Sequence, residues 1–316
     1  MSITLTKSRP VAASDEPAIP RRRSVARAYI ALTKPRIIEL LLVTTVPAMV
    51  LAERGMPSIW LILVTVLGGT LTAGGANAIN CFVDRDIDSI MLRTQTRPLV
   101  RHEITPARAL IFAIGLEVAG FLLLAVFANL LAALLALSAT LFYVFVYTLW
   151  LKRTSVQNIV IGGAAGAVPP LVGWAAVTGR VEWPAVVMFA IVFFWTPAHF
   201  WALALKYRDD YARAGVPMGP VVWGTERTYR GILLYALITA VVALLLVPAG
   251  AAGILYGLGA AVLGALFVLY ALRLKQQATT ASAMRVFAFS IAYLFFLFAM
   301  MVVDQVARGL TGASLV

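Results

Sequence analysis

The sequence has a single cysteine, two histidines and only 13% charged residues in 316 positions. The lone cysteine, Cys81, excludes an intramolecular disulfide and any metal site built from several cysteines. Apolar residues make up 61% of the chain, whereas soluble domains carry roughly 45–50% apolar and about 25% charged residues. So few polar side chains cannot cover a surface in water. The composition therefore indicates an integral membrane protein.

Long apolar stretches recur along the chain, each about 20 residues long and able to cross the hydrocarbon core as a helix. We expect an all-α integral membrane protein with about nine transmembrane helices. The expected spans are 37–53, 58–80, 107–126, 128–149, 157–178, 184–205, 230–249, 252–272 and 286–304. The corresponding domains are a disordered cytoplasmic tail over 1–32, a transmembrane domain over 33–308 and a short C-terminal tail over 309–316.

The basic residues predict the orientation of these spans. They outnumber acidic residues by 26 to 14, an excess that could suggest nucleic acid. However, all but three of the 26 fall on one side of the nine predicted spans, and the exceptions are Arg54, Arg180 and Arg308. By the positive-inside rule, the N-terminus and the even-numbered loops are cytoplasmic and the C-terminus is outside. We therefore expect a lipid bilayer as the surroundings and no nucleic-acid partner.

A cluster of polar residues ends the second predicted span. Asn80, Asp84 and Asp88 are four residues apart and therefore stack along one helical face, about 6 Å per step. Like charges at this spacing destabilise a helix unless a counter-ion is present. Carboxylate and amide oxygens suit Mg²⁺, which keeps other positions for water and phosphate oxygens. Asp86 is rotated away from this face and is expected to face a loop or solvent.

Basic side chains accompany this cluster. Arg93 and Arg97 follow it four residues apart, and guanidinium groups bind phosphate oxygens in pairs. The alternative is that these arginines only satisfy the positive-inside bias. A further predicted cytoplasmic loop offers Lys152 and Arg153.

The end of the sixth predicted span has the same mixture of acidic and basic residues as the end of the second. It carries Lys206, Tyr207, Asp209 and Asp210 within a few residues. A metal–diphosphate needs anionic ligands for the metal and cationic ligands for the phosphates. The loops after the second and sixth predicted spans supply both. The chemistry that suits them is ionisation of an allylic diphosphate, in which Mg²⁺ and basic side chains neutralise the leaving group.

Aromatic residues surround a histidine within the sixth predicted span. Trp195, His199 and Trp201 lie close to Pro197, which frees a backbone carbonyl and opens the helix. His199 could ligate a haem iron, act as a base or hydrogen-bond across helices. The aromatic rings could stabilise a carbocation, line a flat macrocycle or only pack. Glu117 lies within the third span and must face the bundle interior or be protonated, but its role stays open.

Several motifs together resemble the UbiA-type intramembrane prenyltransferases, and within them the protoheme IX farnesyltransferase (haem O synthase) family. The resemblance runs from Thr33 to about Asp304. Its segments include Thr33-Lys-Pro-Arg36, the Asn80–Asp84–Asp88 spacing with Arg93-Thr-x-x-Arg97-Pro98, Trp195-Thr-Pro-x-His199-Phe-Trp201, and Asp210-Tyr-Ala-Arg-Ala-Gly-Val-Pro217-Met218. His102-Glu103 departs from the small pair that the family often has there, which should alter only the loop surface.

The resemblance implies helices around a central cavity, with a cap of cytoplasmic loops. It also implies a Mg²⁺-dependent reaction in which farnesyl diphosphate, haem B and water give haem O and diphosphate. The implied partners are these two substrates and, beyond them, haem A synthase or oxidase assembly factors. The implied location is a cell inner membrane, bacterial rather than mitochondrial.

The resemblance also assigns roles to individual residues. The implied catalytic residues are Asp84, Asp88, Lys206 and Asp210. The implied metal ligands are Asn80, Asp84, Asp88, Asp209 and Asp210. The implied diphosphate-binding residues are Asn80, Arg93, Arg97, Lys152, Arg153 and Tyr207. The implied haem contacts are His199, Trp195 and Trp201.

Two other functions are compatible with parts of the pattern. A prenyltransferase acting on a quinone precursor or chlorophyllide would share the metal site but not the segment from Trp195 to Trp201. A secondary transporter would place its sites near the bilayer midplane on broken helices. The acidic clusters lie instead at the predicted cytoplasmic helix ends, which disfavours a transporter.

Overall fold

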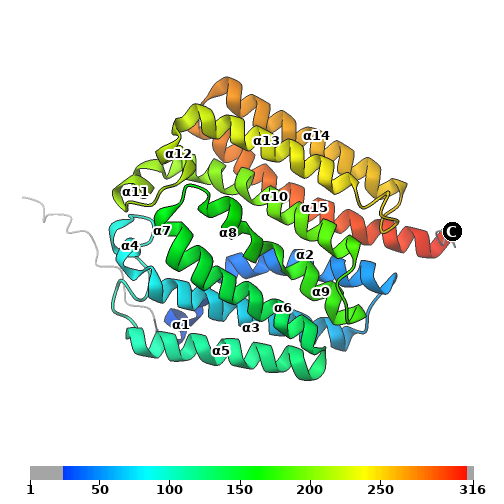
Figure 1. Ribbon diagram of the computed structural model, residues 1–316, viewed down its shortest axis with the longest axis horizontal. Helices are drawn as coiled ribbons and strands as arrows, with labels where there is room; N and C mark the ends of the chain where they lie inside the picture. Colours follow the sequence, from blue (N-terminus) through cyan, green and yellow to red (C-terminus); the bar gives the residue numbers. More distant parts are fainter. Residues whose placement is uncertain (1–23, 312–316) are drawn as a thin grey trace, which may run out of the picture.

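The computed structural model describes residues 24–311, and the regular structure in this part of the chain is helical (Figure 1). Eight stretches in it are long and apolar enough to cross a membrane. They are α3 (Ile59–Val83), α5 (Pro106–Phe127), α6 (Leu130–Leu141) continued by η1 (Phe142–Leu151) and α7 (Lys152–Thr154), α8 (Asn158–Ala167) with α9 (Pro169–Thr178), α10 (Trp183–Lys206), α13 (Gly224–Leu244), α14 (Ile254–Gln277) and α15 (Thr280–Thr311). The all-α membrane class is thus confirmed.

The first of the nine predicted spans corresponds to α2 (Pro35–Glu53). Its apolar part in the described chain is shorter, Val43–Glu53, so α2 is not among the eight long apolar helices. The remaining short helices are α1 (Val25–Thr33), α4 (Arg85–Ile90), α11 (Arg208–Arg213) and α12 (Gly219–Val222).

Helix α1 overlaps the segment predicted as a disordered tail, residues 1–32. Ala28 and Leu32 are buried in a cluster with Ala78, Cys81 and Ala109. Residues 25–32 of the predicted tail are therefore helical and pack against α3 and α5, while the division of the chain into a tail and a transmembrane domain stays a prediction. Residues 1–23 and 312–316 of the predicted tails lie outside the described residues.

Six helical segments form a closed ring. In order, α2, α3, η1, α8, α10 and α15 each contact the next, and α15 contacts α2 again. Helix α5 packs on α3 from one side, while α13 and α14 pack on α10 and α15 from the other (Figure 1). The ring encloses a cavity of about 1070 Å³ lined by all six of its segments. The expected central cavity is therefore present.

The short helices α4, α7, α11 and α12 gather at one end of the bundle, and α15 ends at the opposite end (Figure 1). We call the first of these the charged end. That it faces the cytoplasm remains the prediction made from the basic residues.

Two irregular segments face the cavity. Helix α8 ends at Ala167 and α9 begins at Pro169, so the helix is interrupted at Val168, directly before the Pro169–Pro170 pair, where proline cannot continue the hydrogen-bond ladder. The ten residues of η1 form a π-helix, a rare conformation that is frequent at functional sites. This π-helix is not expected from the sequence.

Candidate active site

The polar cluster at the end of α3 keeps its helical spacing across a change of helix. Asp84 ends α3, and α4 begins directly after it. The Asp84 amide donates to the Asn80 carbonyl at 2.9 Å, and the Asp88 amide donates to the Asp84 carbonyl at 2.8 Å. All three side chains are buried. The four-residue repeat thus continues through the junction.

Lysines hold the first two members of the cluster. Lys34 Nζ donates to Asn80 Oδ1 at 2.7 Å, and Asn80 Nδ2 donates to Asp84 Oδ2 at 2.7 Å. The same Asp84 oxygen forms an ion pair with Lys152. Both lysines and Asn80 line the cavity. Burial lowers the pKa of Lys34 to about 8.

The third member, Asp88, has its own cation. Arg97 pairs with Asp88 Oδ2, and Arg97 lines the cavity. Burial alone would lower the pKa of Arg97, but Asp88 and other nearby groups outweigh this effect, so the pKa is raised. Thr94 donates to the Asp88 carbonyl at 2.9 Å and so fixes the turn that brings Arg97 back. Each carboxylate of the cluster is thus paired with a cation in the cavity wall.

One atom of the cluster fits a metal ion in particular. Asp84 Oδ1 is buried and accepts no hydrogen bond from the described part of the chain; Arg153 Nη2 lies 3.8 Å from it. A buried carboxylate oxygen without a donor is costly, and a hard cation such as Mg²⁺ would satisfy it. Between 24 and 311, no group of three or more His, Cys, Asp or Glu side chains is arranged to hold a metal. The fit therefore depends on Asn80 and on substrate oxygens as further ligands.

The second acidic pair, Asp209 and Asp210 in α11, lies in a different environment from Asp84 and Asp88. Asp210 is buried, and its two oxygens accept from the Leu92 and Arg93 amides at 3.3 and 3.4 Å. Arg213 forms an ion pair with it. Asp209 is exposed and does not line the cavity. Asp210 thus docks α11 onto the segment that follows α4.

Lys206 and Tyr207 lie beside this docked loop. Lys206 is exposed, with Nζ 5.4 Å from the centroid of the Tyr207 ring. Arg93 donates to the Tyr211 hydroxyl at 2.8 Å, and its guanidinium carbon lies 5.0 and 5.4 Å from the Tyr211 and Tyr207 ring centroids. Arg93 and Tyr211 line the cavity, whereas Lys206 and Tyr207 do not. The two loops therefore meet through Arg93.

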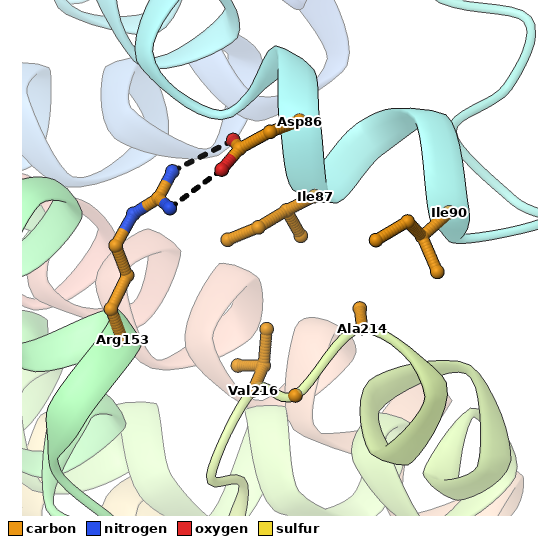
Figure 2. A pocket seen from close by; sticks show the side chains of 7 residues that line it. Asp86, Ile87, Ile90, Arg153, Ala214 and Val216 are labelled. Atoms are coloured by element: carbon orange, nitrogen blue, oxygen red, sulfur yellow. Dashed lines mark hydrogen bonds and ion pairs between the residues drawn. The ribbon is translucent and has the colours of Figure 1, made fainter.

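Arg153 belongs to a separate surface pocket. Its two terminal nitrogens donate to the Asp86 carboxylate at 2.7 and 2.8 Å (Figure 2). The pair borders a pocket of about 270 Å³ between α4 and the turn with Ala214 and Val216. These hydrogen bonds lower the pKa of Asp86 to about 2. Asp86 is 59% exposed, as its rotation from the cluster predicts.

The π-helix places Tyr143 and Tyr147 in the cavity wall, and Lys152, the first residue of α7, follows directly after it and also lines the cavity. Their spacings of four and five residues match a helix whose hydrogen bonds run i→i+5. Thr148 donates to the Tyr143 carbonyl at 2.8 Å and accepts from Asn80 at 3.1 Å, which joins η1 to the polar cluster. The Tyr147 ring lies where a Cβ on Gly162 would be, 2.2 Å away. Tyr147 therefore requires a glycine on α8.

The aromatic segment of α10 divides between two surroundings. Trp195 and His199 line the cavity and stack on each other with ring centroids 4.3 Å apart. Trp201 instead packs edge-on against Trp223 and Tyr235, each at 5.4 Å, outside the cavity lining. Of the three predicted haem contacts, the structure therefore brings Trp195 and His199 together and leaves Trp201 outside the cavity.

Glu117 and five cavity-lining residues complete the comparison between prediction and structure. Glu117 is buried and accepts from Thr140 Oγ1 at 3.1 Å, so it faces the interior as expected. Five residues that line the cavity were not predicted as site residues: Lys34, Arg36, Tyr143, Tyr147 and Tyr211. Lys34 and Arg36 flank a proline just before the first span, and the two η1 tyrosines are four residues apart. Both patterns are visible in the sequence and could have indicated residues of the site.

Comparison with known proteins bears on this site. The sequence matches the UbiA prenyltransferase family over residues 41–300. The chain belongs to this family. It is 56% identical to protoheme IX farnesyltransferase 1 of Saccharopolyspora erythraea, over 94% of this chain and 96% of the relative. It is 53% identical to the protoheme IX farnesyltransferase of Gloeobacter violaceus, over 92% of this chain and 96% of the relative.

Solved structures share the fold. A digeranylgeranylglyceryl phosphate synthase superposes with a TM-score of 0.74 at 18% identity, over 90% of this chain and 99% of that one. A UbiA homologue from Archaeoglobus fulgidus, bound to DMAPP and Mg²⁺, gives a TM-score of 0.61 at 19% identity, over 86% and 99% of the two chains. Both solved structures therefore share the overall fold of this chain.

Proposed function

We propose that this UbiA-family member transfers a farnesyl group from farnesyl diphosphate to a vinyl group of haem B, with addition of water, giving haem O and diphosphate. The observation that carries this proposal is a single cavity with two chemically different ends. Lys34, Asn80 and Arg97 line its polar end, and Trp195 and His199 line its aromatic wall. The relatives that cover more than nine tenths of this chain are named for the same reaction.

The polar end can exchange partners when a diphosphate enters. Arg97 and Lys152 pair with Asp88 and Asp84, and both cations are also of the type that binds phosphate oxygens. Entry of the diphosphate would draw these cations from the carboxylates to the phosphates. The freed carboxylates, together with Asn80, would then hold Mg²⁺.

Bound Mg²⁺ supplies Lewis-acid stabilisation of the charge that develops on the leaving diphosphate. The chain's own cations add to that stabilisation, because they are fixed in place before ionisation. Lys34 adds a third positive charge below its pKa of about 8.

The apolar part of the cavity would hold the farnesyl chain and keep water from the cation until the acceptor has reacted. Tyr143 and Tyr147 are stacked at 5.4 Å in the wall next to Asn80, and aromatic faces attract a cation. His199 and Trp195 would contact the haem. Trp201 would act indirectly, by packing behind the wall.

The reaction is testable with purified protein in detergent, haem B and labelled farnesyl diphosphate. We expect Mg²⁺-dependent formation of haem O, detected as a mass increase of the haem. Farnesylation of a quinone precursor or chlorophyllide in place of haem would contradict the proposed acceptor while leaving the polar end of the site intact. No turnover with any acceptor would contradict the transferase proposal itself.

We further propose a bacterial cell membrane as the location, with the charged end in the cytoplasm and haem A synthase or oxidase assembly factors as partners. The named relatives are bacterial proteins, and the predicted topology puts the C-terminus outside. A periplasmically active reporter fused after residue 316 should be active on this topology, and a cytoplasmic one should not.

A further inference from the structure

A serine on a neighbouring helix touches the cavity histidine. His199 lies in α10 and Ser290 in α15, two adjacent segments of the ring. The distance from His199 Nδ1 to Ser290 Oγ is 2.7 Å, and both residues are buried. Ser290 lies outside the sequence motifs that resemble the family.

The hydrogen-bond directions follow from the chemistry of the groups. Ser290 Oγ also lies 2.7 Å from the Phe287 carbonyl oxygen, which can only accept. The single hydroxyl hydrogen of Ser290 is therefore used by that carbonyl. At 2.7 Å, His199 Nδ1 can then form a hydrogen bond only as an N–H donor to Ser290 Oγ.

This assignment fixes the neutral imidazole. A neutral histidine carries one N–H, so a hydrogen on Nδ1 leaves Nε2 with a free lone pair. Within the described chain, Nδ1 bonds to Ser290 and Nε2 has no hydrogen-bond partner. His199 lines the cavity. The unprotonated nitrogen therefore belongs to a ring in the cavity wall.

Aromatic packing holds the ring in the same orientation. Trp195 stacks on His199 at 4.3 Å, and Phe287 stacks on it at 4.5 Å. Trp195 Nε1 in turn donates to the Ser290 carbonyl at 2.8 Å. Rotation of the imidazole would break the Ser290 hydrogen bond and disturb both stacks.

We infer that Ser290 is a positioning residue that fixes the tautomer of His199, so that Nε2 is free to bind the iron of haem. The part of this inference that concerns haem rests on the proposed function. The tautomer itself does not. Partners that orient a metal-binding histidine in this way tune its affinity for the metal.

The tautomer can be measured without haem. The chain has only two histidines, and His102 is exposed with a φ of 54°, a conformation that asparagine tolerates. In His102→Asn protein labelled with ¹⁵N-histidine, the NMR spectrum in lipid reports on His199 alone. We expect a protonated Nδ1 and an unprotonated Nε2.

Three variants in this background test the role of Ser290. Ser290→Ala should yield a mixture of tautomers, whereas Ser290→Thr, which keeps the hydroxyl, should restore the wild-type spectrum. Ser138→Ala is the matched control, because the exposed Ser138 makes the same 2.7 Å bond to a carbonyl three residues earlier but has no histidine partner. A wild-type ring protonated on Nε2, or a spectrum unchanged by Ser290→Ala, would overturn the inference.

Haem titration separates this inference from the proposed function. Adding haem B should give a difference spectrum that is lost in His199→Ala, and Ser290→Ala should weaken haem binding by roughly tenfold. If the tautomer is as expected but the haem spectrum ignores both substitutions, haem ligation by His199 is wrong and the tautomer assignment stands. If haem binds through His199 with Nε2 protonated in the haem-free protein, the role of Ser290 is wrong and the haem contact stands.

Discussion

Two acidic segments at the charged end of the bundle differ in what their carboxylates contact. Asp84 and Asp88 pair with Lys152 and Arg97, side chains that line the cavity. Asp210 accepts from two backbone amides of the opposite loop, and its cationic partner, Arg213, does not line the cavity.

The type of partner decides whether a carboxylate can change its partner when substrate binds or only holds the structure together. A long cationic side chain can leave a carboxylate for a phosphate group, and a carboxylate so released can take up a metal. A backbone amide cannot leave without unfolding its turn. The first segment is therefore suited to bind substrate, while the second holds the loop that carries Arg93 over the cavity.

The largest effect is expected at Asp84. Asp84→Asn keeps the shape but removes the charge, and we expect Mg²⁺-dependent farnesyl transfer to fall roughly 10²- to 10³-fold. Turnover with labelled farnesyl diphosphate over a Mg²⁺ titration measures the loss. In Asp86→Asn, the control two residues on, turnover should stay within about threefold, because the Asp86–Arg153 pair is at the surface. A similarly small loss in Asp84→Asn would remove Asp84 from the metal site.

A smaller and different effect is expected at Asp210. Asp210→Ala leaves the amides of Leu92 and Arg93 without their acceptor, so the free energy of unfolding should fall by about 1–3 kcal/mol. Misplacing Arg93 should also raise the KM for farnesyl diphosphate by about tenfold. Thermal unfolding in detergent and steady-state kinetics measure the two effects. A changed Mg²⁺ requirement at full stability would instead place Asp210 among the metal ligands.

The activity should depend on pH through Lys34, which donates to Asn80 of the first acidic segment. Because burial lowers its pKa to about 8, the ammonium loses its charge as the pH rises through that value. We expect kcat/KM for farnesyl diphosphate, which reports on the free enzyme, to decline above about pH 8. Lys34→Arg should move this decline to higher pH, and an unchanged profile would exclude Lys34 as its origin.

The stability effect of Lys34 has the opposite sign. Its pKa is about 8 in the folded chain against 10.5 when unperturbed. The unfolded state therefore binds more protons between these values, and this group's contribution to stability rises with pH across that interval. Activity and stability should thus separate in the same pH series.

The smallest effect is expected at Asp209. Its side chain is exposed beside the buried Asp210, so Asp209→Asn should change the stability by less than about 0.5 kcal/mol. Farnesyl transfer should be unchanged in the same assay. A large loss of Mg²⁺-dependent turnover would restore Asp209 as a metal ligand and would erase the contrast with Asp84.

The sequence by itself determined the membrane class, the helical spans and the spacing of Asn80, Asp84 and Asp88. These properties depend on local composition and on the helical repeat, which persists through the α3–α4 junction. Helix α1 and the π-helix were not predicted, because each depends on neighbours distant in the sequence.

Tertiary structure decided which of several similar side chains face the cavity. Trp195 lines it and Trp201 does not; Arg97 lines it, while Arg153 binds Asp86 at the surface. The spacing of residues along one helix fixes their directions relative to each other, but packing against the other helices fixes the rotation of the whole helix. For the same reason the hydrogen bond from His199 to Ser290, 91 residues away, follows only from the closure of the ring.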